Sequence, residues 1–271
     1  MTRSAVVGLG LIGGSAALAL PARGYDRDPA VRRRARERGI ETAESLAEAV
    51  ASADLVLLAV PTQETPALMR EAASAEPGSL LTDASSLKKS IAAAATDLPA
   101  VSRFVGGHPM AGSKASGLEG ASADLFRGRP WLIVPTERSD VHSIAFLQET
   151  VRGIGARPVV VDPERHDNLM TWVSHLPHVS AAALTRAVST GGAEGLARFA
   201  GPGLLDTTRI ADSPSALLLE LALADPEALA AAIESVRADL ARIAGSLRRR
   251  DAADLRAYFD EAVKARRSFE P

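Results

Sequence analysis

Residues 4–20 read SAVVGLGLIGGSAALAL, and this stretch decides the fold of the N-terminal half. A short β-rich run leads into a G-x-G-x-x-G turn, and a helix-forming run follows it. Strand, glycine turn and helix start in this order are the context that a dinucleotide-binding fingerprint requires. The first glycine permits the tight turn, the second lets backbone approach a pyrophosphate, and the third lets the helix pack on the strand. The residues expected to bind the dinucleotide here are Gly8, Gly10, Leu11, Ile12 and Gly13.

The fingerprint also predicts an acidic residue at the end of the second strand, about 20 residues further on. Asp26 lies eighteen positions after Gly8 and is expected to accept hydrogen bonds from the adenosine ribose, which favours NAD. Arg27 follows it and is suited to a 2′-phosphate, so NADP stays open. Only ten residues separate Ser15 from Asp26. This spacing predicts a stunted first helix and a rudimentary second strand.

Alternation of strands and helices continues along the N-terminal half. Residues 54–60, DLVLLAV, form a continuous apolar run of the kind found in buried parallel strands, and further strands are expected at 79–83, 103–107, 131–134 and 157–161. Ligands of open α/β sheets bind outside the carboxyl ends of the strands. Val60, Pro61, Asp83 and His108 fall at such ends, so they are expected to line one crevice with the glycine turn. The arginine-rich helix at 29–38 is expected to present a solvated face.

After Asp162-Pro163 the alternation stops, and helical periodicity continues to the end of the chain. Helices are expected at 164–189, 195–200, 215–223, 226–249 and 252–267. The predicted fold is therefore an α/β N-terminal Rossmann domain with a mostly parallel sheet, residues 1–161, followed by an all-α C-terminal domain, residues 162–271. The apolar helices of the second domain favour a homodimer.

Composition excludes several classes of protein. The 271 residues carry a net charge of −2, which gives no reason to expect nucleic acid or an anionic membrane as a partner. The chain has no cysteine, so it has no disulfide, no thiolate nucleophile and no cysteine-ligated metal. No apolar stretch approaches the roughly 18 residues of a membrane span. The first apolar run starts at Ala5 and leaves no room for a signal peptide, so a cytoplasmic location is expected.

One histidine lies within a glycine-rich stretch, residues 106–117, GGHPMAGSKASG. The small side chains allow close approach of a ligand, and His108 supplies a group that titrates near neutral pH. His175 and His178 have an i, i+3 spacing that suits a metal, a substrate anion or a structural hydrogen bond. A third ligand is missing, so no metal is expected. Arg209 either offers a bidentate fork to a carboxylate or pairs with Asp206 at the surface.

Five motifs occur in order along the chain: residues 8–15 (GLGLIGGS), 82–88 (TDASSLK), 106–117, 174–178 (SHLPH) and 206–211 (DTTRIA). Together they resemble the prephenate/arogenate dehydrogenase family of tyrosine biosynthesis, over nearly the whole chain. The resemblance implies a Rossmann domain and a helical domain that forms an interlocked homodimer. It also implies NAD(P)-dependent oxidative decarboxylation of prephenate to 4-hydroxyphenylpyruvate, or of arogenate to tyrosine, with hydride transfer to the nicotinamide and loss of CO₂.

The resemblance also assigns roles to single residues. His108 is implied to accept the hydrogen bond, and then the proton, of the 4-hydroxyl group. Ser86 is implied to contact the same hydroxyl and the nicotinamide. Arg209 is implied to grip the side-chain carboxylate, with His178 near the substrate. The full set expected to bind substrate is Arg209, His178, His175, Ser113 and Lys114.

Departures from the family pattern leave other functions open. Lys114 stands where many members carry a glutamate, and Leu217 falls about where some members place a tryptophan. A 4-amino-4-deoxyprephenate dehydrogenase therefore remains an alternative. A β-hydroxyacid dehydrogenase needs a lysine in the helical domain, where this chain has only Lys264 near the terminus. A non-catalytic nucleotide-binding dimer is opposed by the intact His108, Ser86 and Arg209.

Overall fold

The structure is a computed structural model that describes residues 3–113, 115, 117–191 and 196–269. The contacts between residues divide the chain into two compact units, Met1–Asn168 and Leu169–Pro271. The first unit is built around a sheet, and the second is helical.

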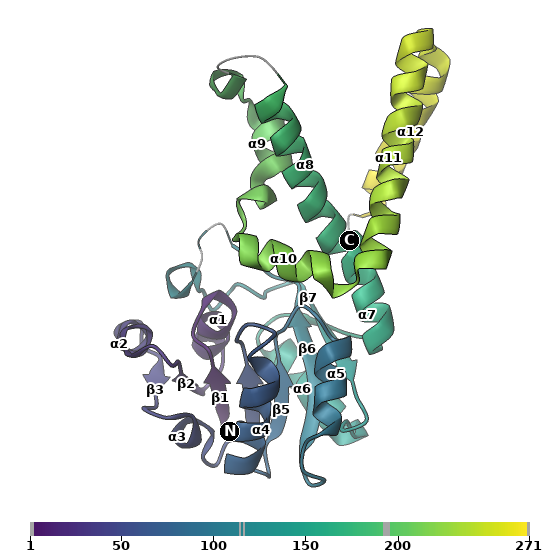
Figure 1. The fold of residues 1–271 in the computed structure, drawn as a ribbon. Coiled ribbons are helices and arrows are strands. Elements are labelled where there is room, and N and C mark those ends of the chain that lie inside the picture. Colours follow the sequence, from purple (N-terminus) through teal and green to yellow (C-terminus); the bar gives the residue numbers. More distant parts are fainter. Residues whose placement is uncertain (1–2, 114, 116, 192–195, 270–271) are drawn as a thin grey trace. The chain divides into compact units, whose positions relative to one another are not determined.

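The first unit contains an eight-stranded sheet with the order β3-β2-β1-β4-β5-β6-β7-β8 (Figure 1). Its strands are β1 (Ser4–Val7), β2 (Ala22–Tyr25), β3 (Glu41–Thr42), β4 (Leu55–Leu58), β5 (Leu80–Asp83), β6 (Arg103–Pro109), β7 (Pro130–Pro135) and β8 (Arg157–Val160). Every neighbouring pair is parallel except β6 with β7. The expected mostly parallel sheet is confirmed. Strand order reverses between β1 and β4, which is the switch point where such sheets bind ligands.

Both faces of the central strands are buried, as their continuous apolar runs predict. Successive residues of a strand point to opposite faces, and β4 shows this directly. Leu55 and Leu57 belong to one hydrophobic cluster, whereas Val56 and Leu58 belong to the other. The first cluster includes α1 (Leu11–Ala19), α2 (Pro29–Glu37) and α6 (Val141–Gly153). The second includes α3 (Leu46–Val50), α4 (Thr65–Ala75) and α5 (Lys89–Thr96).

The segment that follows the glycine turn is short, as expected. Helix α1 has nine residues and ends where the Leu20 amide donates to the carbonyl of Ala16. The second strand is short as well: β2 has four residues, and it pairs with β1 along its whole length. The helix begins at Leu11, immediately after the turn, so it descends far enough for a full strand to return.

The arginine-rich helix α2 is capped by Asp28, which accepts from the Ala30 amide. The expectation of a solvated face is wrong for one of its arginines. Arg32 is buried, and it donates to the Asp26 carbonyl at 2.7 Å and to Glu44 at 2.8 Å. Arg38, at the end of the helix, donates to the carbonyls of Leu118 and Ala121. These guanidinium groups satisfy carbonyl oxygens of neighbouring loops and so hold those loops in place.

The second unit follows helix α7 (Pro163–Met170), which spans the division between the units. A π-helical turn, η2 (Thr171–His175), joins α7 to α8 (Leu176–Thr190). The remaining helices are η3 (Leu196–Phe199), α9 (Pro202–Thr208), η4 (Arg209–Asp212), α10 (Ser215–Ala224), α11 (Pro226–Arg249) and α12 (Ala252–Arg267). None of the described helices combines the length and the apolar character that a membrane crossing requires.

The segment around Arg209 joins two short helices. Asp206 lies within α9, and Arg209 caps that helix and begins the 3-10 turn η4. Gly201-Pro202-Gly203 has residues that suit a turn, yet Pro202 occupies the first helical position, where its missing amide hydrogen costs nothing.

Candidate active site

A cavity of about 440 Å³ lies at the carboxyl ends of β1, β2 and β4. Its lining includes Gly8, Gly10, Asp26, Val60 and Pro61, all of which the sequence predicts to bind a dinucleotide. Leu11, Ile12 and Gly13 form the first turn of α1 directly beyond it. The amide groups of this first turn have no carbonyl partner within the helix, so they are suited to a phosphate group.

The three glycines of the turn have different surroundings. Gly8 adopts a φ of +90°, and a Cβ atom on it would lie 2.4 Å from the Ala59 carbonyl oxygen. A Cβ atom on Gly13 would lie 1.8 Å from the carbonyl oxygen of Gly8, so helix and strand touch there. A Cβ atom on Gly10 would meet nothing within 4 Å. Because Gly10 lines the cavity, its missing side chain leaves room for a ligand, and the turn fits a dinucleotide.

Asp26 lines this cavity, and backbone amides hold its carboxylate in place. One carboxylate oxygen accepts from the Leu9 amide and the other from the Asp28 amide, each at 2.9 Å. A carboxylate has about four acceptor positions, so these two bonds leave capacity for the hydroxyl groups of a ribose. Arg27, beside it, is bound by a second acid: it donates to Glu64 at 3.0 Å. The cation suited to a 2′-phosphate is thus already paired.

Asp83 is expected to bind the cofactor, but its side chain is not accessible. Its side chain is fully buried, and its carboxylate accepts from the Gly107 amide at 3.0 Å and the Ser85 amide at 3.1 Å, and from the ammonium group of Lys88. Burial lowers the pKa of Lys88, and the Asp83 carboxylate opposes that shift. The carboxylate therefore makes contacts within the protein, and its hydrogen bond with the Gly107 amide connects the end of β5 to β6.

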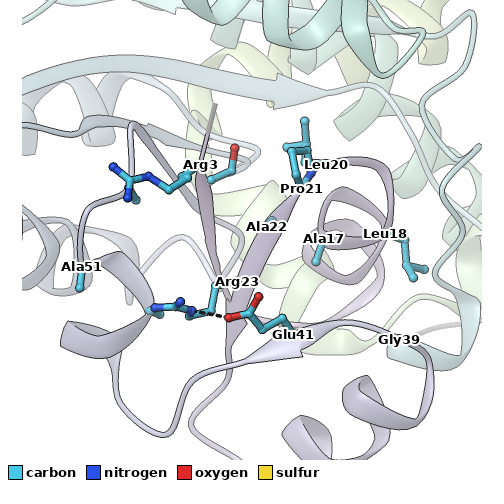
Figure 2. Close-up of a pocket in the computed structure, with 13 residues that line it drawn as sticks. Arg3, Ala17, Leu18, Leu20, Pro21, Ala22, Arg23, Gly39, Glu41 and Ala51 are labelled. Carbon is cyan, nitrogen blue, oxygen red and sulfur yellow. Dashed lines mark hydrogen bonds and ion pairs between the residues drawn. The ribbon is translucent and has the colours of Figure 1, made fainter. Parts of the chain in front are cut away.

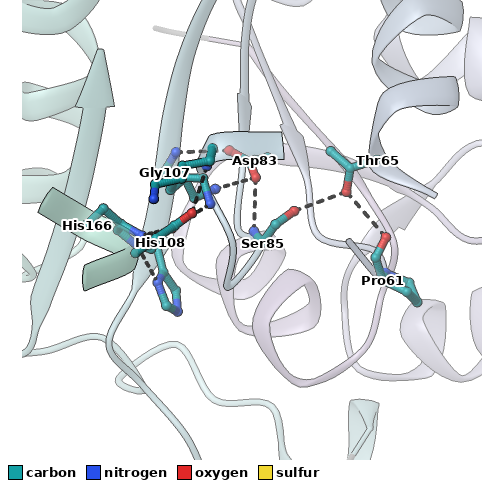
Figure 3. Close-up of polar contacts among 10 residues, drawn as sticks. Pro61, Thr65, Asp83, Ser85, Gly107, His108 and His166 are labelled. Carbon is teal, nitrogen blue, oxygen red and sulfur yellow. Dashed lines mark hydrogen bonds and ion pairs between the residues drawn. The ribbon is translucent and has the colours of Figure 1, made fainter. Parts of the chain in front are cut away.

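The two serines after β5 also have separate surroundings. The Ser85 hydroxyl is buried and lies 3.1 Å from the hydroxyl of Thr65, at the start of α4 (Figure 3). Thr65 in turn donates to the carbonyl of Pro61 at 3.3 Å. Ser86, the residue expected to contact substrate, is half-buried and follows directly. The loop that carries Ser86 is thus attached both to the β4 loop and, through Asp83, to β6.

His108 lies in β6, opposite Leu132 of β7, so the first part of the glycine-rich stretch is strand and not loop. Its Nδ1 atom is 2.9 Å from Nε2 of His166, and the two rings are tilted by 50° with centroids 5.1 Å apart. His166 is fully buried in α7, and its Nδ1 atom is 2.7 Å from Oδ1 of Asp167. Figure 3 shows His108 and His166 side by side. The catalytic candidate is therefore attached to a second histidine and then to a carboxylate.

Asp167 is itself held by backbone. Oδ1 accepts from the Lys88 amide and Oδ2 from the Lys89 amide, each at 2.9 Å. Burial raises the pKa of this carboxyl group, but the hydrogen bonds from His166 and from the two amides outweigh burial, so its pKa lies below the usual value. The network contains buried charges that are all matched by hydrogen bonds, as buried charges must be.

The second unit carries the remaining candidates. His178 lies on α8 with Nδ1 2.8 Å from the Ser174 carbonyl, so Nδ1 carries the hydrogen and Nε2 can accept. His175 is buried in the π-helical turn. Arg209 is exposed at the start of η4, which packs on α8. Leu217 is exposed on α10.

Two candidates come from the glycine-rich stretch. Ser113 is exposed and accepts from the Ala115 amide at 3.3 Å. Lys114 lies outside the described residues. Among the described residues, no group of three or more acidic, histidine or cysteine side chains is placed to hold a metal ion.

A second cavity, of about 450 Å³, lies at the amino ends of β1 and β2 (Figure 2). Leu20 and Pro21 of the short connection line it, and Arg23 donates to Glu41 at 2.8 Å on its wall. It contains none of the candidate residues. The fingerprint and His108 lie instead at the carboxyl ends of the strands.

Comparison with known proteins identifies both parts of the chain. The nucleotide-binding domain of prephenate dehydrogenase matches residues 20–160, and the dimerization domain of prephenate dehydrogenase matches residues 162–261. The chain belongs to the prephenate dehydrogenase family. The expected family and fold class are confirmed, and the dehydrogenase assignment is confirmed at the level of the family.

Relatives within the prephenate dehydrogenase family match along the whole chain. The prephenate dehydrogenase of Lactococcus lactis subsp. cremoris (strain MG1363) is 33% identical and is matched over 100% of this chain and 78% of its own length. The cyclohexadienyl dehydrogenase of Zymomonas mobilis is 31% identical, over 97% of this chain and 94% of its own. The solved prephenate dehydrogenase from A. aeolicus, in complex with hydroxyphenyl propionate and NAD+, has a TM-score of 0.89 and 28% identity, covering 100% of this chain and 99% of that one. Synechocystis arogenate dehydrogenase has a TM-score of 0.83 and 28% identity, covering 99% and 100%.

Sequence analysis assigns no role to Lys88, His166 or Asp167, which the structure connects to His108. The pair His166-Asp167 follows the last strand and the cap at Asp162 within a few positions, but nothing in one sequence shows that it meets His108. Lys88 closes the motif at 82–88, but its place in the sequence does not show that its ammonium group pairs with Asp83. Only the fold brings these side chains to the ends of β5 and β6.

Proposed function

We propose that this protein catalyses the NAD-dependent oxidative decarboxylation of prephenate to 4-hydroxyphenylpyruvate, or of arogenate to tyrosine. The observation that carries the proposal is His108, placed at the carboxyl end of β6 with Nδ1 engaged by His166. The fingerprint turn stands at the carboxyl end of β1 in the same sheet. The names of the relatives support a cyclohexadienol substrate.

When bound, NAD+ supplies the acceptor for the hydride that leaves C4 of the substrate. Nε2 of His108 accepts the proton of the 4-hydroxyl group as the hydride departs, which prevents positive charge from building on that oxygen. Loss of CO₂ from the ring then leaves the electron pair that completes the aromatic ring. His108 returns its proton to the phenolate oxygen, so no net proton is released. Ser86 is proposed to orient the same hydroxyl group.

Arg209 is proposed to bind the side-chain carboxylate of the substrate. Its guanidinium is exposed at the start of η4 and offers the planar fork that matches a carboxylate. His178, His175, Ser113 and Lys114 complete the proposed substrate set, and His178 presents Nε2 as an acceptor because Nδ1 is bound to the Ser174 carbonyl.

Arg209→Gln is expected to raise KM for the substrate by roughly 10- to 100-fold with kcat changed less than about threefold, because a charge-assisted bond contributes about 1.5–3 kcal/mol. Steady-state kinetics at saturating NAD measure this. Arg209→Lys keeps the charge but loses the planar fork, so its KM is expected to lie between those of the wild type and Arg209→Gln. Arg186→Gln, on the exposed face of α8, should have the KM and kcat of the wild type. A fall in kcat at unchanged KM would contradict this role.

We also propose a preference for NAD over NADP. The 2′-phosphate of NADP would meet a cavity that contains Asp26, Glu64 and Glu71, and the neighbouring Arg27 is paired with Glu64. The negative charges of these carboxylates disfavour binding of the 2′-phosphate. The guanidinium of Arg27, paired with Glu64, cannot offer all its donors to that phosphate.

Glu64→Gln is expected to raise kcat/KM for NADP by about tenfold, because it releases Arg27 for the 2′-phosphate, and to change kcat/KM for NAD by less than about threefold. Glu71→Gln is the matched control: it removes the same charge from the same cavity but leaves the bond between Arg27 and Glu64 in place. An equal gain in both variants would attribute the preference to net charge alone, and no gain in Glu64→Gln would contradict the role of Arg27.

The proposed function is tested by mixing the purified protein with NAD or NADP and each of prephenate, arogenate and 4-amino-4-deoxyprephenate. The reduced cofactor is followed by its absorbance, and CO₂ release is measured in parallel. Reduction with prephenate or arogenate is the expected result. Reduction with the amino compound alone would favour the alternative dehydrogenase, and no reduction with any pair would overturn the proposal.

The protein is proposed to act as a homodimer in the cytoplasm. The matching family domain is described as a dimerization domain. In the described part of the second unit, large apolar side chains are exposed on three successive helices: Leu219 and Leu223 on α10, Leu240 and Leu247 on α11, and Phe259 and Val263 on α12. An apolar surface of this kind is typical of an interface between subunits.

A further inference from the structure

The carboxylate of Asp167 determines which nitrogen of His166 carries a hydrogen. Its two oxygens accept from the amides of Lys88 and Lys89, and Oδ1 also faces Nδ1 of His166 at 2.7 Å. The pKa of Asp167 lies below its usual value, so the group is ionised near neutral pH and can only accept. Nδ1 of His166 must therefore donate, and it carries the hydrogen.

In its neutral form, a histidine with hydrogen on Nδ1 has a lone pair on Nε2. Nε2 of His166 is 2.9 Å from Nδ1 of His108, so it accepts a hydrogen bond from that atom. His166 is fully buried, so no solvent competes for this bond. His108 then carries its hydrogen on Nδ1, and its Nε2 atom is left with a lone pair.

We propose that His166 and Asp167 are positioning residues that hold His108 in the tautomer a general base requires. This inference rests on the proposed function, in which Nε2 of His108 accepts the proton of the substrate hydroxyl. The arrangement has the logic of a catalytic triad, in which a buried carboxylate orients a histidine, extended by one further imidazole ring. His108 touches the substrate in this scheme, whereas His166 and Asp167 act through His108.

The charges around the network favour the same proton movement. When Nε2 of His108 accepts a proton, the positive charge on its ring faces His166, and the carboxylate of Asp167 lies directly behind. The other charged groups packed there are the ammonium group of Lys88 and the carboxylate of Asp83, which pair with each other. Asp167 is thus the negative charge that directly contacts His166, and an opposite charge nearby stabilises an imidazolium.

The network also holds the ring of His108 in place through two parts of the chain. Lys88 donates its amide to Asp167 and its ammonium group to Asp83, and Asp83 accepts from the Gly107 amide next to His108. The start of α5 therefore fixes both the backbone and the ring of His108. A shift of either anchor would turn Nε2 away from the position it holds.

His166→Phe removes the acceptor while keeping a ring of similar size. The expected result is a fall in kcat of about 10²-fold, with KM for the substrate and the Kd for NADH changed less than about threefold. The acid limb of the kcat profile is expected to move to lower pH, because activity needs neutral His108 and the imidazolium loses the support of Asp167. His166→Gln places an amide oxygen near the Nε2 position, so its kcat is expected to be about tenfold higher than that of His166→Phe.

The tautomer itself is measured by ¹⁵N NMR of labelled histidine, which needs no substrate. In the unmodified protein, Nδ1 of His108 is expected to carry the hydrogen and Nε2 the lone pair, and in His166→Phe this bias is expected to disappear. His142→Gln, on the exposed face of α6, serves as the control and should change neither kinetics nor the His108 signals.

Hydrogen on Nε2 of His108 in the unmodified protein would overturn the inference, even if His166→Phe fails to fold. A folded His166→Phe with unchanged kcat and pH profile would also overturn it. A large rise in KM and Kd in this variant would do the same, because it would indicate a structural role only. If no candidate substrate is turned over, the proposed function fails, but the NMR measurement still decides whether His166 sets the tautomer.

Discussion

His108→Asn is expected to lower kcat by about 10³-fold while KM for prephenate or arogenate changes less than about threefold. Asparagine keeps a polar side chain next to His166 but has no group that accepts a proton near neutral pH. The proton of the 4-hydroxyl group would then have no acceptor as hydride leaves C4, so the transition state is affected far more than binding. Steady-state kinetics at saturating NAD measure the two constants separately.

Two measurements separate loss of a base from loss of structure. NADH binding and the thermal midpoint of His108→Asn are expected to match the wild type, because the ring is half-buried at the end of β6 and fills no core position. In the wild type, kcat is expected to fall at acid pH, because a protonated His108 cannot accept the substrate proton, and this acid limb should be absent from the residual activity of the variant. A variant with normal kcat and a raised KM would assign His108 to binding and remove it from the mechanism.

Several elements follow from local signals in the sequence. Helices α11 and α12 have the expected bounds, because Asp225 and Asp251 cap their first turns. The buried strand β4 follows from its continuous apolar run. Capping and periodicity act over a few residues, so a single sequence contains them in full.

Other elements depend on contacts that no local pattern contains. The two residues of β3 form a strand only because β2 lies beside them. Arg32 and Arg38 look like solvated residues of an arginine-rich helix, yet the carbonyls they bind lie up to 83 positions away. Helix α9 could not be predicted from its first residues, because a proline between two glycines suits a turn equally well.

The candidate site divides in the same way. The fingerprint glycines and Asp26 could be predicted, because their spacing along the chain is itself the signal. The partners of His108 could not, since His166 is 58 positions away, and Asp167 is held by an amide 79 positions away. Asp83 was expected to face the cofactor, but its carboxylate is buried by Lys88 and Gly107, which only the packing of β5 against β6 reveals. The residues that contact a catalytic side chain from distant parts of the chain are therefore visible only in the folded structure.

Gly13→Ala and Gly10→Ala separate the two functions of the glycine turn. A methyl group at Gly13 would lie 1.8 Å from the Gly8 carbonyl oxygen and 3.0 Å from the Cβ atom of Ala59, so α1 would have to move away from β1. Overpacking of this kind costs roughly 3 kcal/mol, so the thermal midpoint is expected to fall by about 5–10 °C. The Kd for NADH is expected to rise at least about tenfold, because the first turn of α1 no longer faces the phosphates.

Gly10→Ala is the matched variant, because its methyl group meets no protein atom within 4 Å and its backbone is extended with a φ of −75°. The thermal midpoint is expected to change by less than about 1 °C, since alanine adopts this backbone without strain. The Kd for NADH should nevertheless rise about tenfold or more, because the methyl group occupies the space where backbone approaches the pyrophosphate. Thermal unfolding and NADH fluorescence titration measure both quantities on the same samples. Normal NADH binding in Gly10→Ala would mean that the pyrophosphate does not cross this turn, and an unchanged midpoint in Gly13→Ala would contradict the close contact between helix and strand.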